Sequence, residues 1–139
     1  MELGSNYTPN EVAWAHLRKA RRSFQAPERL LKDGLYEDSV SRAYYAMFHA
    51  AKACLANENL FPKTHSGVIS EFGRVFVIPG KVDEKLGQAL SEAKEEREDS
   101  DYEAFVEVEE REAGKILADA ADLLEKSEAI VARTESDTN

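Results

Sequence analysis

The chain has 139 residues, of which 42% are hydrophobic and 32% charged, and its formal net charge is −9. This length suits one domain with one core, and the hydrophobic content excludes wholesale disorder. No apolar run approaches the roughly 20 residues that a membrane span needs, and the N-terminus has neither a basic segment nor an apolar signal core. We therefore expect a single-domain cytoplasmic protein that does not cross a membrane.

The acidic charge is unevenly distributed along the chain. Residues 11–63 hold nine Lys or Arg and six Asp or Glu, a net charge of +3. Residues 81–139 hold eight basic and nineteen acidic residues, a net charge of −11. This asymmetry permits a basic surface on the first two helices, so the overall sign does not exclude RNA as a partner.

The first predicted helix begins at Thr8, after a flexible N-terminal segment of residues 1–7. Thr8 and Glu11 have the spacing of a capping box, and Pro9 suits the first helical position. A mostly apolar face then recurs at the three- and four-residue spacing of an amphipathic helix. It consists of Val12, Ala13, His16, Ala20 and Phe24.

Pro27 interrupts this first helix. Its ring removes a backbone hydrogen bond and clashes with the carbonyl four residues earlier, so we expect a kink or a restart near Ala26. The helix should end at Gly34. A second helix is predicted from about Tyr36 to Asn57, before polar stop signals.

A short third helix is predicted after the cap residue Thr64. Its apolar face consists of Val68, Ile69, Phe72, Val75 and Phe76. The β-branched and aromatic residues of 74–78 also favour a strand, but one strand without a partner cannot form a sheet. We therefore predict a helix that gives way to a turn over residues 77–80.

A fourth helix is predicted from Val82 to about Asp99. Its acidic end opposes the helix dipole, so we expect a break at Ser100 and a final helix that opens near Asp101 or Tyr102. The apolar face of this final helix consists of Val106, Ala113, Leu117, Ala120 and Leu124.

Residues 133–139 contain no core-forming side chains, which predicts a disordered tail. The connections between the predicted helices are short, and short connections favour antiparallel neighbours. The pattern as a whole predicts an all-α, single-domain, up-and-down bundle of four to five helices within residues 8–132.

The second helix carries the strongest chemical signal, within residues 38–55. At about 100° per residue it has an apolar stripe beside a polar-aromatic one. The apolar stripe is Tyr44, Met47, Phe48, Ala51 and Leu55, and the polar-aromatic stripe is Arg42, Tyr45, Ala46, His49 and Lys52. Arg42 and His49 share a face about 10 Å apart along the axis, with Tyr45 between them. A cation, a phenol and an imidazole in one row suit a phosphate ligand.

Three stretches resemble the HEPN domain family, in its small stand-alone prokaryotic branch. They read SRAYYAMFHAAKACL, KTHSGVISEFGRVFV and REDSDY, and the resemblance covers roughly residues 10 to 130. It implies a helical bundle that usually forms a homodimer. Many members are metal-independent ribonucleases with an Arg and a His four to six residues apart, often encoded beside a minimal nucleotidyltransferase antitoxin. Arg42 and His49, with six residues between them, fit the edge of that pattern, and other members only bind.

With this resemblance, Arg42 and His49 are the candidate catalytic residues. His49 would act as general acid or base, because imidazole titrates near neutral pH, and Arg42 would steady the phosphate charge. Tyr45 would orient the phosphate or stack on a base, and Lys52 lies beside it as a second candidate substrate-binding residue. The alternative reading is a row of surface charges or a dimer-contact face.

His65 opens the third helix, where free backbone N–H groups favour an anion. We name it as a further substrate-binding candidate, against the reading of an ordinary capping cluster. His16 lies on an otherwise apolar face and is interpreted as a hydrogen-bonded core or rim residue. Tyr102 is predicted to lodge its ring in the bundle.

Metal or cofactor binding is not expected. Three scattered histidines and one cysteine lack the short ligand spacings of a zinc site, and the acidic residues 92–101 lack the pattern of a calcium loop. These acids are expected to form a solvated face. Cys54 is predicted to be buried and inert.

The family resemblance, together with the polar-aromatic stripe, implies an RNA-cleaving or RNA-binding toxin component that works as a homodimer. The first alternative is a non-catalytic helical adaptor that binds a nucleotidyltransferase partner or a nucleotide. The second is a structural homodimer that uses the polar-aromatic stripe as its interface.

Overall fold

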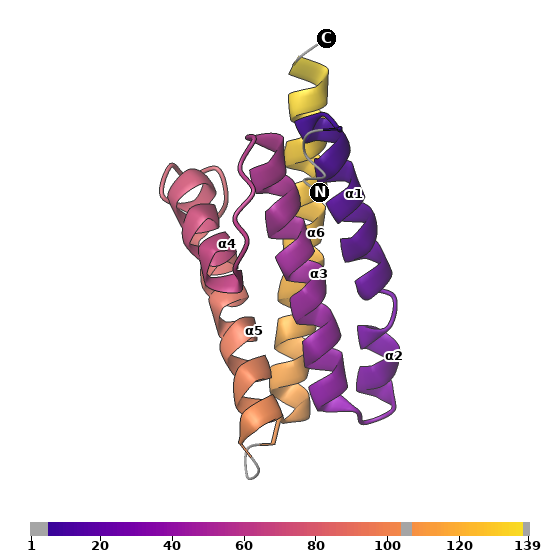
Figure 1. Cartoon of the computed structure of the whole chain (residues 1–139). Coiled ribbons are helices and arrows are strands. Elements are labelled where there is room, and N and C mark those ends of the chain that lie inside the picture. Colours follow the sequence, from indigo (N-terminus) through magenta and orange to yellow (C-terminus); the bar gives the residue numbers. More distant parts are fainter. Residues whose placement is uncertain (1–5, 104–106, 138–139) are drawn as a thin grey trace.

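The computed structural model describes residues 6–103 and 107–137. Within these residues the chain forms helices and no strand, as Figure 1 shows. The elements are α1 (Pro9–Ser23), α2 (Pro27–Lys32), α3 (Tyr36–Asn57), α4 (His65–Phe72), the π-helical turn η2 (Gly73–Val77), α5 (Glu84–Tyr102) and α6 (Glu110–Asp137). The predicted all-α, single-domain, up-and-down bundle is confirmed.

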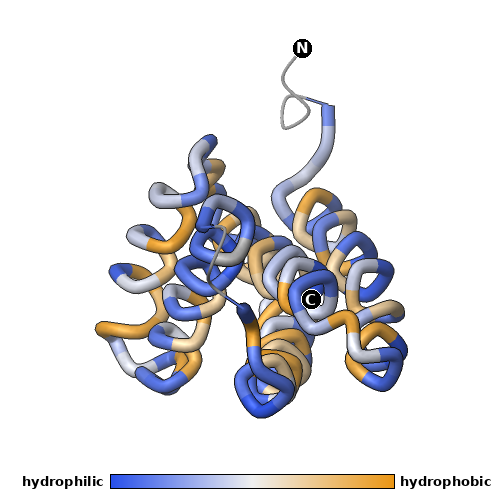
Figure 2. Tube along the Cα trace, turned by 90° about the horizontal axis from the view of Figure 1, so that it is seen from below, coloured by the Kyte–Doolittle hydropathy of each residue, from blue (hydrophilic) through white to orange (hydrophobic). Residues whose placement is uncertain are grey.

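Helix α3 is the centre of the bundle and contacts each of the other α-helices. Helices α1 and α2 lie along one side of it, α4 and α5 along the other, and α6 lies behind (Figure 1). More than half of the residues of α3 are buried, and many are alanines that let neighbouring helices approach closely. Seen along the bundle in Figure 2, each helix combines hydrophobic and hydrophilic residues, as packing around a shared core requires.

The predicted starts of the first and third helices are confirmed by their cap hydrogen bonds. The Thr8 hydroxyl accepts the Glu11 backbone N–H at 3.1 Å, and the Thr64 hydroxyl accepts the Gly67 backbone N–H at 2.9 Å. Each bond satisfies a donor that the first helical turn leaves without a partner. The bounds of the second predicted helix, Tyr36 and Asn57, match those of α3.

The predicted break at Pro27 separates α1 from α2. The Ser39 hydroxyl of α3 donates to the Pro27 carbonyl at 2.8 Å, which ties the start of α2 to the central helix. The predicted end at Gly34 is also confirmed, because this glycine adopts φ +78°, a conformation that favours residues without a Cβ.

The third helix extends further than predicted. The chain continues from α4 into η2 as a π-helical turn, and only then turns at Gly80, with φ +84°. Val75 and Val77 pack against the core from this turn, so burial of apolar side chains favours a helical continuation over the predicted turn at Val77.

The predicted boundary between the last two helices is wrong. Helix α5 does not break at Ser100 but continues to Tyr102, and α6 begins at Glu110 rather than near Asp101. Ion pairs one turn apart offset the unfavourable acidic charge at this helix end, including Arg97 with Asp101 at 3.6 Å. The predicted core position Val106 lies outside the described residues.

Several predicted features concern the two chain ends and the core. Residues 1–5 and 138–139, within the predicted flexible segments, lie outside the described residues, and α6 runs on to Asp137. The domain limits 8–132 stay a prediction. The predicted face of α6 is buried at Ala113, Leu117, Ala120 and Leu124. No helix among the described residues is long and apolar enough to span a membrane.

Candidate functional site

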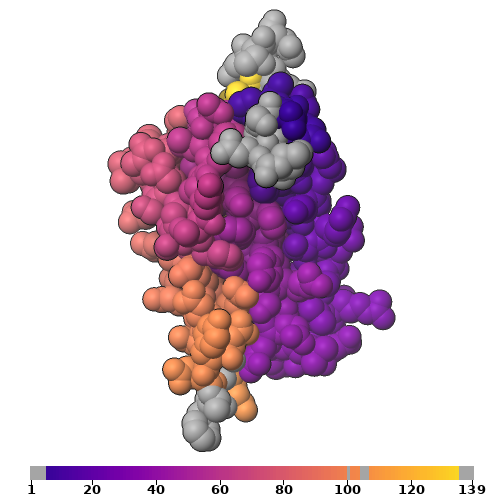
Figure 3. Space-filling model, viewed as in Figure 1, coloured from indigo at the N-terminus to yellow at the C-terminus, as the bar shows by residue number. Residues whose placement is uncertain are grey.

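The candidate site lies along α3 between its two flanking pairs of helices. All three histidines of the chain meet there, because α1 supplies His16, α3 supplies His49 and α4 supplies His65. Figure 3 shows the side of the molecule on which α3 is visible between α1–α2 and α4–α5, with α6 mostly behind it. We call the row formed by His16, His49, Phe48 and His65 the histidine row.

His49 contacts His16 rather than Arg42. The Nδ1 atoms of the two imidazoles are 3.2 Å apart, a hydrogen-bond distance, and both rings are partly buried. The ring planes are inclined by only 23°, and the ring centroids are 5.4 Å apart. Rings lying directly face to face would have closer centroids, so the two imidazoles meet edge to edge through their nitrogens.

Burial keeps both of these imidazoles neutral. Desolvation, followed by the charge of Lys52, lowers the pKa of His16 to about 4. Desolvation, followed by the charges of Lys19 and Lys52, lowers the pKa of His49 to about 4. At neutral pH the pair therefore has no charge, and each ring has one N–H and one lone pair.

His65 is held at the other end of the histidine row by two aromatic rings. The Tyr44 hydroxyl lies 2.7 Å from His65 Nδ1, and the Phe48 ring stacks on the imidazole with centroids 4.1 Å apart. Burial raises the pKa of Tyr44 to about 12, so the phenol keeps its proton in this hydrogen bond. Desolvation and the charge of Arg97 lower the pKa of His65.

Arg97 of α5 is the cation that contacts Tyr45. Its Nη2 donates to the Tyr45 hydroxyl at 2.9 Å, although the two residues are 52 positions apart in the chain. The guanidinium also lies 4.8 Å from the centroid of the Tyr45 ring and 5.6 Å from that of Tyr44. These contacts place a delocalised positive charge beside the polar-aromatic stripe of α3.

Arg42 is exposed at the N-terminal end of the same stripe, about two turns from His49. It lines a hollow of about 390 Å³ together with Tyr45, Asp38 and Ser41. At the opposite end, the Lys52 ammonium lies 5.3 Å from the centroid of the Phe48 ring. Tyr45 therefore borders both Arg42 and Arg97, and Lys52 borders the histidine row.

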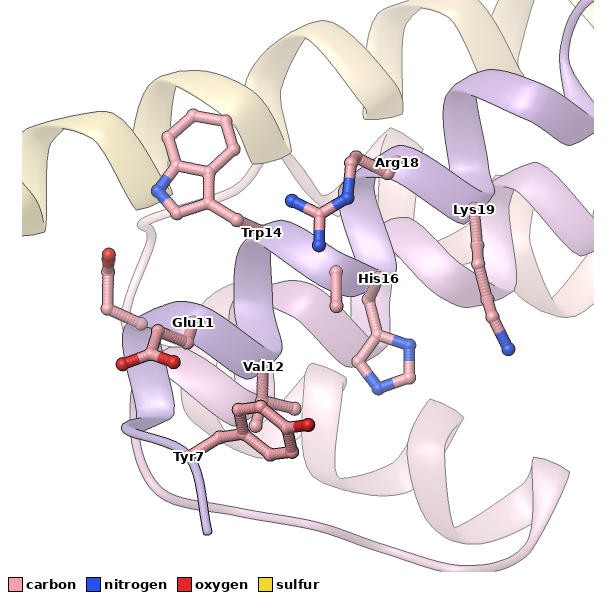
Figure 4. A pocket seen from close by; sticks show the side chains of 9 residues that line it. Tyr7, Glu11, Val12, Trp14, His16, Arg18 and Lys19 are labelled. Carbon is pink, nitrogen blue, oxygen red and sulfur yellow. The ribbon is translucent and has the colours of Figure 1, made fainter. Parts of the chain in front are cut away.

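A larger hollow of about 600 Å³ lies against α1 (Figure 4). Tyr7 and Trp14 contribute aromatic walls, and Arg18 contributes a positive charge. His16 and Lys19 also line it and extend from α1 toward the same side in Figure 4. The hollow therefore adjoins the histidine row through His16.

Sequence reasoning missed two contributors to this site. It interpreted His16 as a core or rim residue, and its partner proves to be the candidate catalytic His49. It included Arg97 only as the first residue of the stretch REDSDY and gave it no role. In the sequence, His16 is one of only three histidines and Arg97 lies within a run of acidic residues. Neither feature identifies the residue that each side chain contacts.

One further expectation about aromatic residues is wrong. Tyr102 is not lodged in the bundle, because 83% of its surface is exposed at the end of the extended α5. Tyr44 and Phe48 of the predicted apolar stripe are buried, with only 0% and 7% of their surfaces exposed. The core of a single chain already covers these two rings.

The predicted burial of Cys54 is confirmed, and burial raises the pKa of its thiol to about 11.

The structure also places the acids of α5 and α6 close together. Desolvation, and a hydrogen bond that the protonated Glu96 carboxyl donates to Glu112, raise the pKa of Glu96 to about 7. Among residues 6–103 and 107–137, no group of three or more His, Cys, Asp or Glu side chains is arranged to hold a metal ion.

Comparisons with known proteins agree with the resemblance inferred from the three sequence stretches. A family model for the HEPN domain matches residues 13–130. A protein of Methanocaldococcus jannaschii named "Putative toxin MJ0605" is 40% identical over 110 residues, which cover 79% of this chain and 81% of that relative. A second protein of this organism, named "Putative toxin MJ0142", is 37% identical over 73% of this chain and 69% of its own length. An Archaeoglobus fulgidus protein named UPF0332 is 40% identical over 83% of this chain and 91% of its own length. The chain therefore belongs to the HEPN domain family.

Proposed function

We propose that this protein is a metal-independent endoribonuclease and the toxin component of a toxin–antitoxin pair. The observation that carries the proposal is the contact of His49 with His16, whose Nδ1 atoms are 3.2 Å apart, in a row bordered by Lys52 of α3 and Arg97 of α5. Two similar proteins bear names that include the word toxin, which supports the second part. The partner in such a pair is a nucleotidyltransferase antitoxin.

The local charge around the histidine row suits an RNA backbone despite the net charge of −9. The pKa values of the three histidines are lowered partly by the positive charges of Lys19, Lys52, Lys94 and Arg97. These side chains come from α1, α3 and α5, so their charges add where the three helices meet. A phosphodiester held there gains attraction from each cation.

The reaction is an internal transesterification. His49 takes the proton of a ribose 2′-hydroxyl, and the 2′-oxygen bonds to the adjacent phosphorus as the bond to the 5′-oxygen breaks. The leaving 5′-oxygen then takes the proton from His49, so the imidazole ends the cycle neutral. Arg42 stabilises the charge of the phosphorane. Tyr45, Lys52 and His65 bind the substrate around it.

The test compares purified wild-type protein with His49→Ala on a single-stranded RNA. Loss of the acid–base group should lower the cleavage rate about 10² to 10⁴-fold and leave the fold intact. The products of the wild type should end in a 2′,3′-cyclic phosphate. Arg133→Ala, which removes an exposed cation from α6, is the matched control and should cleave like the wild type.

Cleavage should also survive a chelator, because side chains supply both the base and the positive charge in this mechanism. Full activity of His49→Ala, or loss of wild-type activity with chelator, would contradict the proposal.

The hollow beside His16 favours a second candidate function, that of a non-catalytic adaptor that binds a nucleotide. Its volume of about 600 Å³ and its aromatic walls, Tyr7 and Trp14, suit a stacked base. Calorimetric titration with a nucleotide separates the two functions. Binding that Trp14→Ala abolishes, in a protein that cleaves no RNA, would support the adaptor.

A further inference from the structure

The contact between His16 and His49 has room for one proton between the two facing nitrogen atoms. Their Nδ1 atoms are 3.2 Å apart, which is too close for two N–H groups to point at each other and suits one N–H and one lone pair. The ring planes are inclined by 23° and the centroids are 5.4 Å apart, so the rings approach each other through this Nδ1 contact. One ring is therefore the donor and the other the acceptor.

The two possible arrangements give His49 different chemistry. If His16 donates, His49 accepts at Nδ1 and has its own proton on Nε2, where it cannot act as a base. If His49 donates, its proton is on Nδ1 and its Nε2 has a free lone pair. Only the second arrangement allows the ring to take a proton from a substrate hydroxyl.

We propose that His16 is a positioning residue for the reaction, because it accepts the Nδ1–H of His49 and so keeps the Nε2 lone pair of His49 available as the base. This inference rests on the proposed function, since it assigns a role in that same reaction. A substrate hydroxyl that donates to Nε2 selects this arrangement over the other. His16 comes from α1 and His49 from α3, so the packing of these helices brings the two imidazoles into contact.

The pair also provides a place for the transferred proton. As Nε2 of His49 takes the proton of the 2′-hydroxyl, the Nδ1 proton of His49 moves to Nδ1 of His16. The positive charge then lies on His16, and His49 keeps its new Nε2–H. When the 5′-oxygen leaves, it takes this proton and the shared proton returns to His49, so both rings end neutral.

The charged surroundings of the pair keep it neutral before the reaction. Lys19 of α1, Lys52 of α3 and His65 of α4 act on His49, in addition to its burial. Lys19 and Lys52 also act on His16. These groups oppose protonation of either ring, so the shared hydrogen bond is between neutral imidazoles over the physiological pH range.

Three substitutions of His16 test this role with side chains of matched length. The side chains of Asn, Asp and Leu each have an atom at the δ position, the same number of bonds from Cα as the imidazole Nδ1. His16→Asn supplies an amide oxygen that accepts the Nδ1–H of His49. His16→Asp supplies a charged acceptor, and His16→Leu supplies a methyl group that cannot accept.

The cleavage rates should separate these variants. His16→Leu should lower the rate roughly tenfold, the effect expected for one lost hydrogen bond, whereas His16→Asn should stay within a few fold of the wild type. His16→Asp should keep the tautomer and shift the acidic limb of the pH–rate profile upward, because a carboxylate beside His49 favours its protonated form. Equal rates for His16→Leu and His16→Asn would overturn the proposal.

A measurement without RNA cleavage tests the pairing on its own. The ¹⁵N chemical shifts of His49 distinguish a protonated Nδ1 from a protonated Nε2. In His16→Asp the proton should lie on Nδ1, and in His16→Leu the Nδ1 population should fall. If the wild type does not cleave RNA, the proposed function is refuted. The ¹⁵N shifts of His49 would still test whether His16 accepts its Nδ1–H. Identical His49 shifts in the two variants would refute the role of His16 even in an active enzyme.

Discussion

At the scale of single residues, the site contains two arginines with different surroundings. Arg42 is exposed and lines the hollow beside Tyr45. Arg97 is partly buried, donates to the Tyr45 hydroxyl and lies over two aromatic rings. The first is free to meet a phosphate, while the second holds part of the stripe in place. Substitution by Lys, which keeps the charge but loses the planar fork, separates these roles.

Arg42→Lys should lower the cleavage rate without changing the melting temperature, because a bidentate phosphate contact is lost while nothing in the fold depends on the side chain. Arg97→Lys should lower the melting temperature as well, because lysine lacks the planar guanidinium that donates to the Tyr45 hydroxyl and lies over two aromatic rings. Cleavage assays and thermal unfolding of both variants measure this difference. An unchanged cleavage rate in Arg42→Lys would assign the phosphate contact to another cation.

At the scale of elements, the contact between α1 and α3 makes stability depend on pH. The pKa values of His16 and His49 are about 4 in the folded chain, below their ordinary value of 6.5. Between these two values the unfolded chain binds protons that the folded chain does not, so unfolding becomes more favourable as the pH falls. The stabilising contribution is present above pH 6.5 and is lost as the pH falls toward 4.

His16→Leu should therefore reduce the loss of stability between pH 7 and pH 5, because one of the two depressed imidazoles is gone. Chemical denaturation of both proteins at the two pH values measures the effect, and comparison with the wild type removes the contribution of the many carboxylates. An equal loss in both proteins would show that His16 takes up a proton as easily when folded as when unfolded.

The turn η2 approaches α5 closely at Gly87. A Cβ at Gly87 would lie 2.8 Å from Cγ2 of Val77, whereas a Cβ at Gly114 of α6 would meet no atom within 4 Å. Alanine is the better helix former by about 0.5–1 kcal/mol. At Gly114 this gain is available, but at Gly87 the stiff, β-branched Val77 must move.

Gly114→Ala should therefore raise the melting temperature, and Gly87→Ala should lower it. Thermal unfolding of the two variants under one condition measures the contrast. A rise of similar size in both would mean that η2 shifts away from α5 at little cost.

At the scale of the whole molecule, the arrangement of helices decides whether a second copy is needed. Each chain already brings three histidines and Arg97 together from four helices, so all residues of the candidate histidine row come from one subunit. Among the described residues, the exposed large hydrophobic side chains are Tyr7, Leu35, Phe61, Ile78 and Tyr102. Of these, Tyr7 shares a hollow with His16 and Tyr102 shares one with His65. The homodimer implied by the family resemblance stays a prediction.

Sedimentation velocity at micromolar concentrations should give a dimer, in which two polar-aromatic stripes face a shared cleft. The same measurement on Arg133→Ala, on the opposite helix α6, serves as the control. A monomer that still cleaves RNA would contradict a shared cleft and leave the single-subunit site as the active form.

The amino-acid sequence by itself determined the class of fold and most helix limits. Caps such as Thr8 and Thr64 bond to residues three positions away, and the apolar periodicity of α3 is a property of one helix, so local chemistry is sufficient for both. The same local reasoning failed at the end of α5, where ion pairs along the helix outweighed the unfavourable charge at its terminus.

Only the tertiary structure decided which side chains share the site. His16 meets His49 across 33 positions of the chain, and Tyr45 meets Arg97 across 52. Periodicity assigns each residue to a face of its own helix, but the rotation and translation of packed helices decide which residues on two faces touch. For this reason the stripe on α3 was predictable, whereas the partner of His49 was not.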